Sequence, residues 1–141
     1  MSPDLIGVLI GVPFVAAAIW LIRNRRFEDW AWPATLASLP LYYIASGALA
    51  SDSTAVMLEL LYGLPYIALG IVLWRRTNPL ALVLLGVAWL SHGLYDFFHD
   101  VFFVNPGVFA WYPVFCAVVD LAVGGYLILL ANSDRLRVDS N

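Results

Sequence analysis

Long apolar stretches dominate this chain and leave few choices of fold. Of its 141 residues, 62% are hydrophobic and only 12% are charged, and the mean hydropathy is +0.85. Soluble domains usually carry about 25% charged residues. Because about 20 consecutive apolar residues can cross the hydrocarbon core of a bilayer as a helix, the sequence predicts an all-α, polytopic integral membrane protein.

Short polar breaks divide the sequence into five such stretches. We place the transmembrane spans at about residues 4–22, 31–50, 54–74, 79–98 and 109–131. Little chain remains outside them, so we treat residues 1–141 as a single transmembrane domain. Spans two to five each carry polar residues on one helical face, which predicts a four-helix core with the first span outside it.

The first span has no polar face, but it contains two glycines at a spacing that favours close helix packing. Gly7 and Gly11 are four residues apart and therefore lie on the same side of a helix. We expect this side to pack either on the bundle or on a second copy of the chain, in which case the glycines would join a homo-oligomer.

Basic residues predict the orientation of the spans. All seven are arginines, and they follow the first, third and fifth spans as Arg23, Arg25 and Arg26, then Arg75 and Arg76, then Arg135 and Arg137. By the positive-inside rule the arginine end is cytoplasmic, so the N-terminus lies outside and the C-terminus inside. We expect a multi-pass protein of a bacterial inner membrane.

The small number of charges also limits the partners. Seven arginines placed at span ends are explained by topology and contact with anionic lipid, so we expect the lipid bilayer as partner and no nucleic acid. Cys116 is the single cysteine, which excludes an intrachain disulfide.

One segment of the fourth span gathers the groups that are costly to bury in a membrane. The stretch SHGLYDFFHD, residues 91–100, holds both histidines, and His92, Asp96 and His99 share one helical face at positions i, i+4 and i+7. Glu59 in the third span and Asp120 in the fifth span lie on the polar faces of their own helices. We expect these side chains to meet in the outer half of the membrane, with His99 at the mouth nearer water.

The charges of these side chains do not balance. The three carboxylates outnumber the two histidines, and every arginine lies at the other end of the spans. An uncompensated charge inside a bilayer costs about 2.5–3.5 kcal/mol even on lenient scales. The cluster therefore predicts either protons held on the carboxylates or a bound cation.

Histidine and carboxylate together are typical ligands of zinc, iron or manganese, which are the metals we expect. The predicted ligands are His92, Asp96, His99, Asp120 and Glu59. Three more side chains are candidates for the surrounding pocket: Tyr62, Tyr66 and Cys116. In the second span, the polar face is predicted to contain Thr35, Ser38, Tyr42 and Ser46.

Three functions remain open at this stage. The first is an intramembrane metalloenzyme acting on a lipid-like substrate, with Asp96, Asp120 and Tyr95 as candidate catalytic residues. The second is a proton- or cation-coupled transporter. The third is a non-enzymatic ligand-binding or accessory subunit, in which the polar residues only hold helices together. The spacing of the histidines does not match the HExxH motif of metalloproteases, so no motif selects among them.

Overall fold

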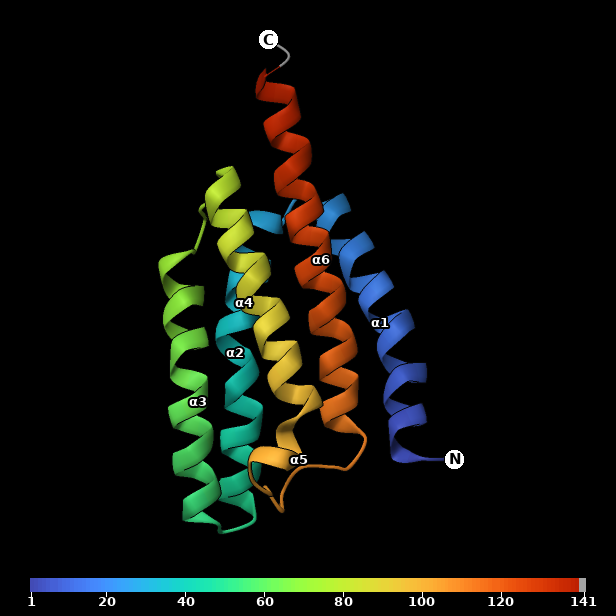
Figure 1. The fold of residues 1–141 in the computed structure, drawn as a ribbon, viewed down its shortest axis with the longest axis vertical. Coiled ribbons are helices and arrows are strands. Elements are labelled where there is room, and N and C mark those ends of the chain that lie inside the picture. The colour runs from blue at the N-terminus through green and yellow to red at the C-terminus, as the bar shows by residue number, and fades with distance from the viewer. Residues whose placement is uncertain (140–141) are drawn as a thin grey trace.

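The computed structural model describes residues 1–139, and the side chains of residues 1–133. Over these residues the fold is all-α and contains six helices (Figure 1). The helices are α1 (Pro3–Arg25), α2 (Glu28–Leu49), α3 (Ser53–Val72), α4 (Pro79–Phe97), α5 (His99–Phe102) and α6 (Tyr112–Asp139). The short helix α5 was not predicted from the sequence.

Four of these helices are long and apolar enough to cross a membrane. They are α1, α3, α4 and the Tyr112–Ser133 part of α6. Helix α2 has 22 residues but does not belong to this set. Its tryptophans, tyrosines and prolines lower its mean hydropathy, although the helix is as long as its neighbours. The molecule is therefore a helical protein with four candidate membrane spans.

Capping residues explain where several helices begin. The side chains of Ser2, Asp52 and Asn78 accept hydrogen bonds from backbone N–H groups three residues later, at 3.3, 3.0 and 2.9 Å. A proline follows Ser2 and Asn78 directly, at a position where its missing N–H costs nothing. The start points of α1, α3 and α4 are thus set by local sequence.

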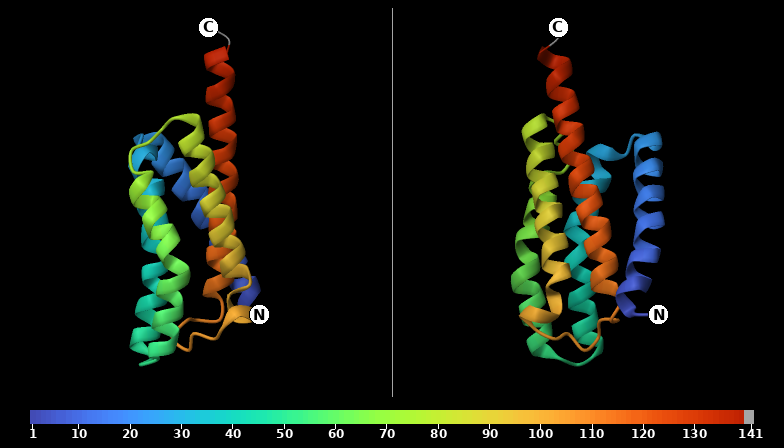
Figure 2. Two further views of the ribbon diagram at one scale, coloured as in Figure 1. Left: turned by 60° about the vertical axis from the view of Figure 1, so that its left-hand side comes forward. Right: turned by 45° about the vertical axis from the view of Figure 1, so that its right-hand side comes forward.

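The long helices form two layers. Helix α2 lies beside α3, α4 lies beside α6, and α1 packs on α6 at the edge of the bundle (Figures 1 and 2). Large aromatic side chains fill the space between the α2–α3 pair and the α4–α6 pair. The ring of Trp32 meets that of Trp89 edge to face at 6.0 Å, and Tyr43 meets Tyr95 at 6.4 Å.

Glycine allows α4 and α6 to approach each other closely. A Cβ atom on Gly86 would lie 2.9 Å from the carbonyl oxygen of Gly124, and one on Gly124 would lie 2.8 Å from the carbonyl oxygen of Gly86. Real side chains at either position would push the helices apart. This close contact brings polar residues of the two helices together one to two turns away.

Helix α1 uses its glycines within the same chain. A Cβ atom on Gly7 would lie 2.6 Å from the carbonyl oxygen of Trp111, and one on Gly11 would lie 3.1 Å from a methyl group of Val118. Both glycines are buried against α6. The close helix contact that these glycines permit is made inside one chain, and the homo-oligomer through Gly7 and Gly11 stays a prediction.

An apolar core fills the half of the bundle nearest the arginines. Its fully buried members include Leu36, Leu85, Trp89, Val123 and Leu127. The α4 residues of this set precede His92, and the α6 residues follow Asp120. Since α4 begins and α6 ends at the arginine end (Figure 1), the core lies between the polar cluster and that end.

The predicted polar face of the second span is partly wrong. Thr35 and Ser38 are exposed on the outside of α2, and Tyr42 is only half-buried. The buried face of α2 instead carries Tyr43, together with Ser46 from the predicted set. The hydroxyl of Ser38 donates to the carbonyl oxygen of Thr35 at 2.8 Å, so this serine needs no partner in the core and its polarity does not require burial.

Candidate metal site

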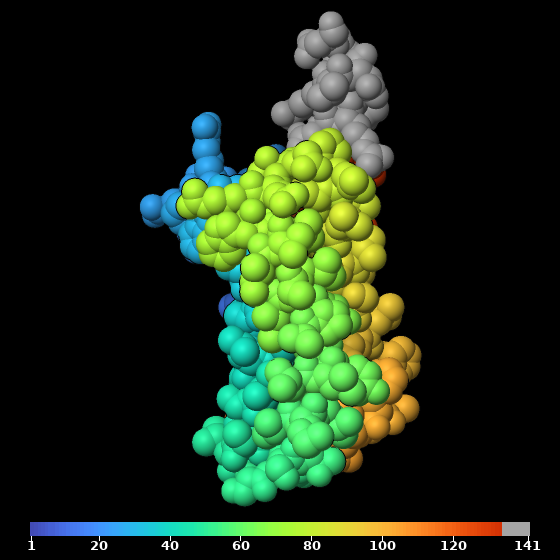
Figure 3. All heavy atoms as spheres, turned by 90° about the vertical axis from the view of Figure 1, so that its left-hand side faces the viewer, coloured from blue at the N-terminus to red at the C-terminus, as the bar shows by residue number. Residues whose placement is uncertain are grey.

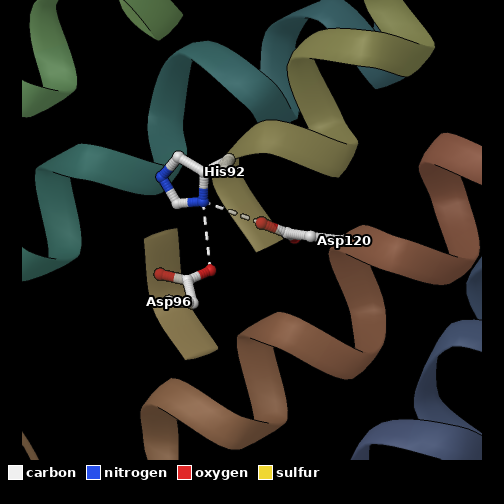
Figure 4. Close-up of side chains that lie close together, drawn as sticks. All are labelled: His92, Asp96 and Asp120. Carbon is white, nitrogen blue, oxygen red and sulfur yellow. Dashed lines mark hydrogen bonds and ion pairs between the residues drawn. The ribbon is translucent and has the colours of Figure 1, made fainter. Parts of the chain in front are cut away.

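Three acidic and imidazole side chains meet between α4 and α6. Nδ1 of His92 lies 2.7 Å from Oδ2 of Asp120 and 3.1 Å from Oδ2 of Asp96 (Figure 4). His92 and Asp96 are one turn apart on α4, and Asp120 projects from α6. One ligand atom from each residue lies within 4.8 Å of the other two, so the three together could hold a metal ion. We call them the triad.

The triad is sealed from solvent within the chain. The exposed fractions of His92, Asp96 and Asp120 are 1%, 1% and 0%. Oδ1 of Asp96 and Oδ1 of Asp120 are both buried without any hydrogen-bond partner. A buried carboxylate oxygen without a partner is costly, so these two atoms are suited to accept a proton, a water molecule or a cation.

Charge leads to the same conclusion. With His92 protonated and both aspartates ionised, the triad carries a net charge of −1, and the ion pairs of the described residues bring no arginine to it. A divalent cation with two carboxylates and a neutral imidazole gives zero net charge. One additional proton on an aspartate would also give zero. Both solutions keep the site neutral inside a membrane.

Two tyrosines line the triad. The ring of Tyr66 meets that of His92 edge to face at 4.6 Å, which fixes one side of the imidazole. Tyr43 is 1% exposed and its hydroxyl has no hydrogen-bond partner. The ring of Tyr43 lies 6.4 Å from that of Tyr95, which precedes Asp96 in the chain. Three buried oxygen atoms without a hydrogen-bond partner therefore occur in this part of the bundle, on Tyr43, Asp96 and Asp120.

Glu59 of α3 is the centre of a second polar network. Its Oε2 accepts from the hydroxyl of Tyr95 at 2.8 Å. Its Oε1 accepts from Nε2 of His99 at 2.9 Å and from Nδ2 of Asn105 at 2.8 Å. Glu59 is 2% exposed, and both of its carboxylate oxygens accept hydrogen bonds from these donors. The network ties α3 to α4, to α5 and to the loop after α5, and Figure 3 shows the α5 segment beside α3 at the lower end of the molecule.

The loop after α5 closes over this network. Asn105 donates to the backbone carbonyl oxygen of Tyr43 at 3.0 Å, and its Oδ1 accepts from the N–H of Gly107 at 3.2 Å. A Cβ atom on Gly107 would lie only 2.0 Å from the carbonyl oxygen of Ser46, so only glycine fits at this contact. The loop is thereby anchored on the C-terminal end of α2.

The sequence predicted that His99 lies near water, but the structure buries it. It is 1% exposed, because α4 ends at Phe97 and α5 turns the imidazole inward, where it stacks on Tyr43 at 4.8 Å. Burial by itself lowers the pKa of His99, but hydrogen bonds to Glu59 and Asp100 outweigh burial and raise the pKa above its ordinary value. The contact with Glu59 therefore favours the protonated form of His99.

The five predicted ligands thus form two groups. His92, Asp96 and Asp120 make the triad, while Glu59 and His99 satisfy each other in the second network. Tyr95 belongs to that network as well, since its hydroxyl donates to Glu59. A shared helical face brought the residues to one region, but it did not decide which of them contact each other.

The predicted pocket residues take different places around these groups. Tyr66 contacts His92, as described above. Tyr62 is 41% exposed and stacks on Tyr95 at 5.5 Å, so it covers the second network from outside. Cys116 is buried one turn before Asp120 on α6, outside the group of three ligands.

Two residues of the site were not predicted from the sequence. Tyr42 was predicted for the polar face in place of Tyr43, although only Tyr43 lies on the same face as Leu36, Pro40 and Gly47. Asn105 lies in a loop, where helical periodicity carries no information. Its position before Pro106 and Gly107 is a turn signal, but nothing in that signal predicts contact with Glu59.

No protein-family model, curated protein or solved structure matches the chain. What the site can do therefore follows from its own geometry: a helical protein with four candidate membrane spans carries a buried His/Asp triad that could bind a metal ion.

Proposed function

We propose that this is a five-span membrane protein whose triad of His92, Asp96 and Asp120 binds a divalent metal ion in the outer half of the membrane. The observation that carries the proposal is the pair of buried, unpartnered oxygens on Asp96 and Asp120, beside an imidazole nitrogen. A cation would use lone pairs that otherwise have no partner. It would also bring the charge of the triad to zero.

The ligand set favours zinc, iron or manganese. One imidazole nitrogen and two carboxylate oxygens form a site of mixed hardness, which suits these ions better than a set made only of oxygens or one that contains thiolate. Zinc–nitrogen and zinc–oxygen bonds measure about 2.0–2.2 Å. Since the nitrogen lies 2.7 and 3.1 Å from the two oxygens, the three ligands need only a small outward movement to surround an ion.

The connections between the helices support five spans. The link between α1 and α2 lies at one end of the bundle, and the link between α2 and α3 lies at the other (Figure 1). If α1 and α3 both cross the membrane, α2 must cross it between them in the opposite direction. Its 22 residues give a length of about 33 Å, which matches the hydrocarbon core.

The orientation that we propose places the N-terminus outside and the C-terminus in the cytoplasm, in a bacterial inner membrane. The arginines after α1 and α3 lie at one common end of the bundle, opposite the triad and α5. Reporter fusions after Arg76 and after Asn105 should report the cytoplasm and the outside, respectively. The opposite pattern would place the triad on the cytoplasmic half.

Transport across the membrane fits the fold less well than a one-sided site. The core between the triad and the arginine end is apolar, and Trp89, Val123 and Leu127 within it are 0% exposed. An ion or proton leaving the triad inward would meet no polar side chain among them. This arrangement favours binding at the triad over passage through it.

Metal-dependent hydrolysis of a lipid-like substrate is a second candidate. Three protein ligands leave a position for water on a four-coordinate ion, which is typical of catalytic zinc sites. A metal ion there would supply a water of lowered pKa. An aspartate oxygen of the triad that does not bind the ion could accept its proton, and the hydroxyl of Tyr43 could donate to the reacting group.

Calorimetric titration tests the binding proposal. Protein in detergent is stripped with chelator and titrated with Zn²⁺, Mn²⁺ or Fe²⁺, and we expect saturation by one of them at about one ion per chain. His92→Gln and Asp120→Asn should remove this binding. His99→Gln is the matched control, because it removes the other buried histidine and should leave binding intact. Binding that is lost in the control and kept in the other two variants would contradict the proposal, and no binding by any ion would favour an accessory subunit with a structural network.

A further inference from the structure

A cavity lies at the opposite end of the molecule from the triad. It measures about 540 Å³, is partly open to the outside, and is lined by residues from the end of α1, the start of α2, the start of α4 with the preceding loop, and α6. Cavities of roughly 300–1,000 Å³ are typical of small-molecule sites. The lining residues are Arg23, Glu28, Thr77, Leu82, Tyr126, Leu129, Leu130 and Ser133. We call it the inner cavity.

The inner cavity carries one positive and one negative side chain. The ion pairs of the described residues all involve histidine, so Arg23 and Glu28 are not paired directly with each other. Instead, the hydroxyl of Tyr126 donates to Oε1 of Glu28. Arg23 and Glu28 thus both line the same cavity.

This charge pattern selects a class of ligand. A purely anionic ligand would suit Arg23 but meet repulsion from Glu28, and a purely cationic ligand would meet the reverse. A molecule with a phosphate and an amine matches both, because guanidinium binds phosphate and a carboxylate accepts from ammonium. The hydroxyls of Thr77 and Ser133 offer further hydrogen bonds to phosphate oxygens.

The surroundings place the cavity at the level of lipid headgroups. Exposed tryptophans mark this end of the bundle: Trp20 is 66% exposed, Trp74 is 45% exposed, and Trp30 lies against Trp74 at 6.4 Å. Tryptophan is enriched where the hydrocarbon core meets the headgroups. The leucines of the cavity add apolar surface next to its polar wall, as the junction of headgroup and acyl chain requires.

We propose that the inner cavity binds a zwitterionic phosphorylated amine, with its phosphate on Arg23 and its amine on Glu28. The chemistry is that of the phosphoethanolamine group, either as the headgroup of phosphatidylethanolamine or as the free compound. The site is separate from the triad, so this proposal does not depend on metal binding.

The test uses the full chain in a mild detergent, with thermal unfolding and native mass spectrometry as readouts. Added phosphatidylethanolamine should raise the melting temperature and remain bound to the chain. Phosphatidylglycerol, which lacks the amine, and phosphatidylcholine, whose quaternary nitrogen cannot donate to Glu28, should do so much less. Soluble phosphoethanolamine is titrated in parallel: an effect equal to that of the lipid identifies the free compound as ligand, and an effect of the lipid alone identifies the headgroup.

Variants test whether the stabilisation by phosphatidylethanolamine arises from binding in the inner cavity. Arg23→Gln and Glu28→Gln should each remove the stabilisation by phosphatidylethanolamine, and the amide of the second variant still accepts from Tyr126. Arg25→Gln is the matched control, since it removes an exposed arginine from the same helix end but outside the cavity. Equal stabilisation by phosphatidylglycerol, or full stabilisation retained in Glu28→Gln, would overturn the proposal.

Discussion

Nδ1 of His92 lies 2.7 Å from Oδ2 of Asp120, and this contact joins α4 to α6 where both side chains are closed to solvent. The same nitrogen lies 3.1 Å from Asp96. Each residue of the triad therefore compensates the charge of another, and the loss of one changes the environment of the remaining two.

This relationship predicts strong coupling between His92 and Asp120. His92→Ala and Asp120→Ala should each cost about 3–5 kcal/mol of stability, because each leaves a buried charged group without its partner. The double variant should cost little more than either single one. Melting temperatures and denaturant midpoints of all four proteins in one detergent measure this coupling energy.

A control for this coupling pairs His92→Ala with Asp100→Ala, since the side chain of Asp100 is 74% exposed and makes no contact with His92. These two effects should add. Asp120→Asn should be milder than Asp120→Ala, because the amide keeps a hydrogen-bonding group and removes a charge that needs balancing. Fully additive effects of His92→Ala and Asp120→Ala would separate the triad into independent residues.

The contact between α4 and α6 predicts opposite results at two adjacent glycines. A Cβ atom on Gly124 would lie 2.7 Å from Cγ of Leu90 and 2.8 Å from the carbonyl oxygen of Gly86, whereas one on Gly125 would meet nothing within 4 Å. Gly124→Ala should therefore cost about 1–3 kcal/mol through overpacking. Gly125→Ala should be neutral or stabilise by up to about 1 kcal/mol, because alanine is the better helix former.

Thermal unfolding of the two glycine variants measures this difference in stability. The same pair should differ in metal affinity, since helices that move apart at Gly124 also separate Asp120 from His92. Equal melting temperatures would show that α4 and α6 are not in close contact.

The second network predicts that Glu59 stabilises the fold more than Asp100 does. Glu59→Ala leaves three donors without an acceptor, on Tyr95, His99 and Asn105, and should cost about 3–5 kcal/mol. Asp100→Ala removes an exposed partner of His99 and should cost less than about 1 kcal/mol. Denaturant unfolding in detergent measures both, and similar small losses would mean that Glu59 is not at the centre of a buried network.

The raised pKa of His99 predicts that stability falls with increasing pH. The groups that face it are Glu59 from α3, Asp100 on α5, and the rings of Tyr43 and Tyr95. A group whose pKa is higher in the folded state contributes stability that is fully present below its unfolded value, about pH 6.5, and is lost as pH rises through the folded value.

Melting curves between about pH 6 and pH 9 test this prediction on chelator-treated protein. The melting temperature of the wild type should fall more steeply than that of His99→Gln, whose amide can still donate to Glu59 but does not titrate. Two parallel curves would show that His99 does not change its charge in this range.

Much of the fold could be predicted because apolar stretches of membrane length are visible in the hydropathy of the sequence. Apolar stretches of membrane length predicted the all-α class, and the stretches that became α1, α3, α4 and α6 are long and apolar enough to span a bilayer. Helix α5 could not be predicted in this way. Its four residues lie in the connection between the predicted fourth and fifth spans, where hydropathy predicts no helix.

The site was harder to predict because contact depends on details that periodicity does not contain. The i, i+4, i+7 pattern assumes a continuous helix, which is valid for His92 and Asp96 but fails at His99, where α4 has already ended. The face of α2 was misjudged for another reason. Serine can satisfy its hydroxyl on its own helix, as Ser38 does, so polarity alone did not mark the buried side, which Tyr43 occupies.

Metal content tests the central claim most directly. Wild-type protein, Asp120→Asn and His99→Gln are expressed in metal-replete medium, purified in the same detergent, and analysed by elemental mass spectrometry. We expect about one zinc, iron or manganese ion per chain in the wild type and in His99→Gln, and close to none in Asp120→Asn. Equal metal content in the wild type and Asp120→Asn, or no metal in a well-folded wild type, would contradict a metal site at His92, Asp96 and Asp120.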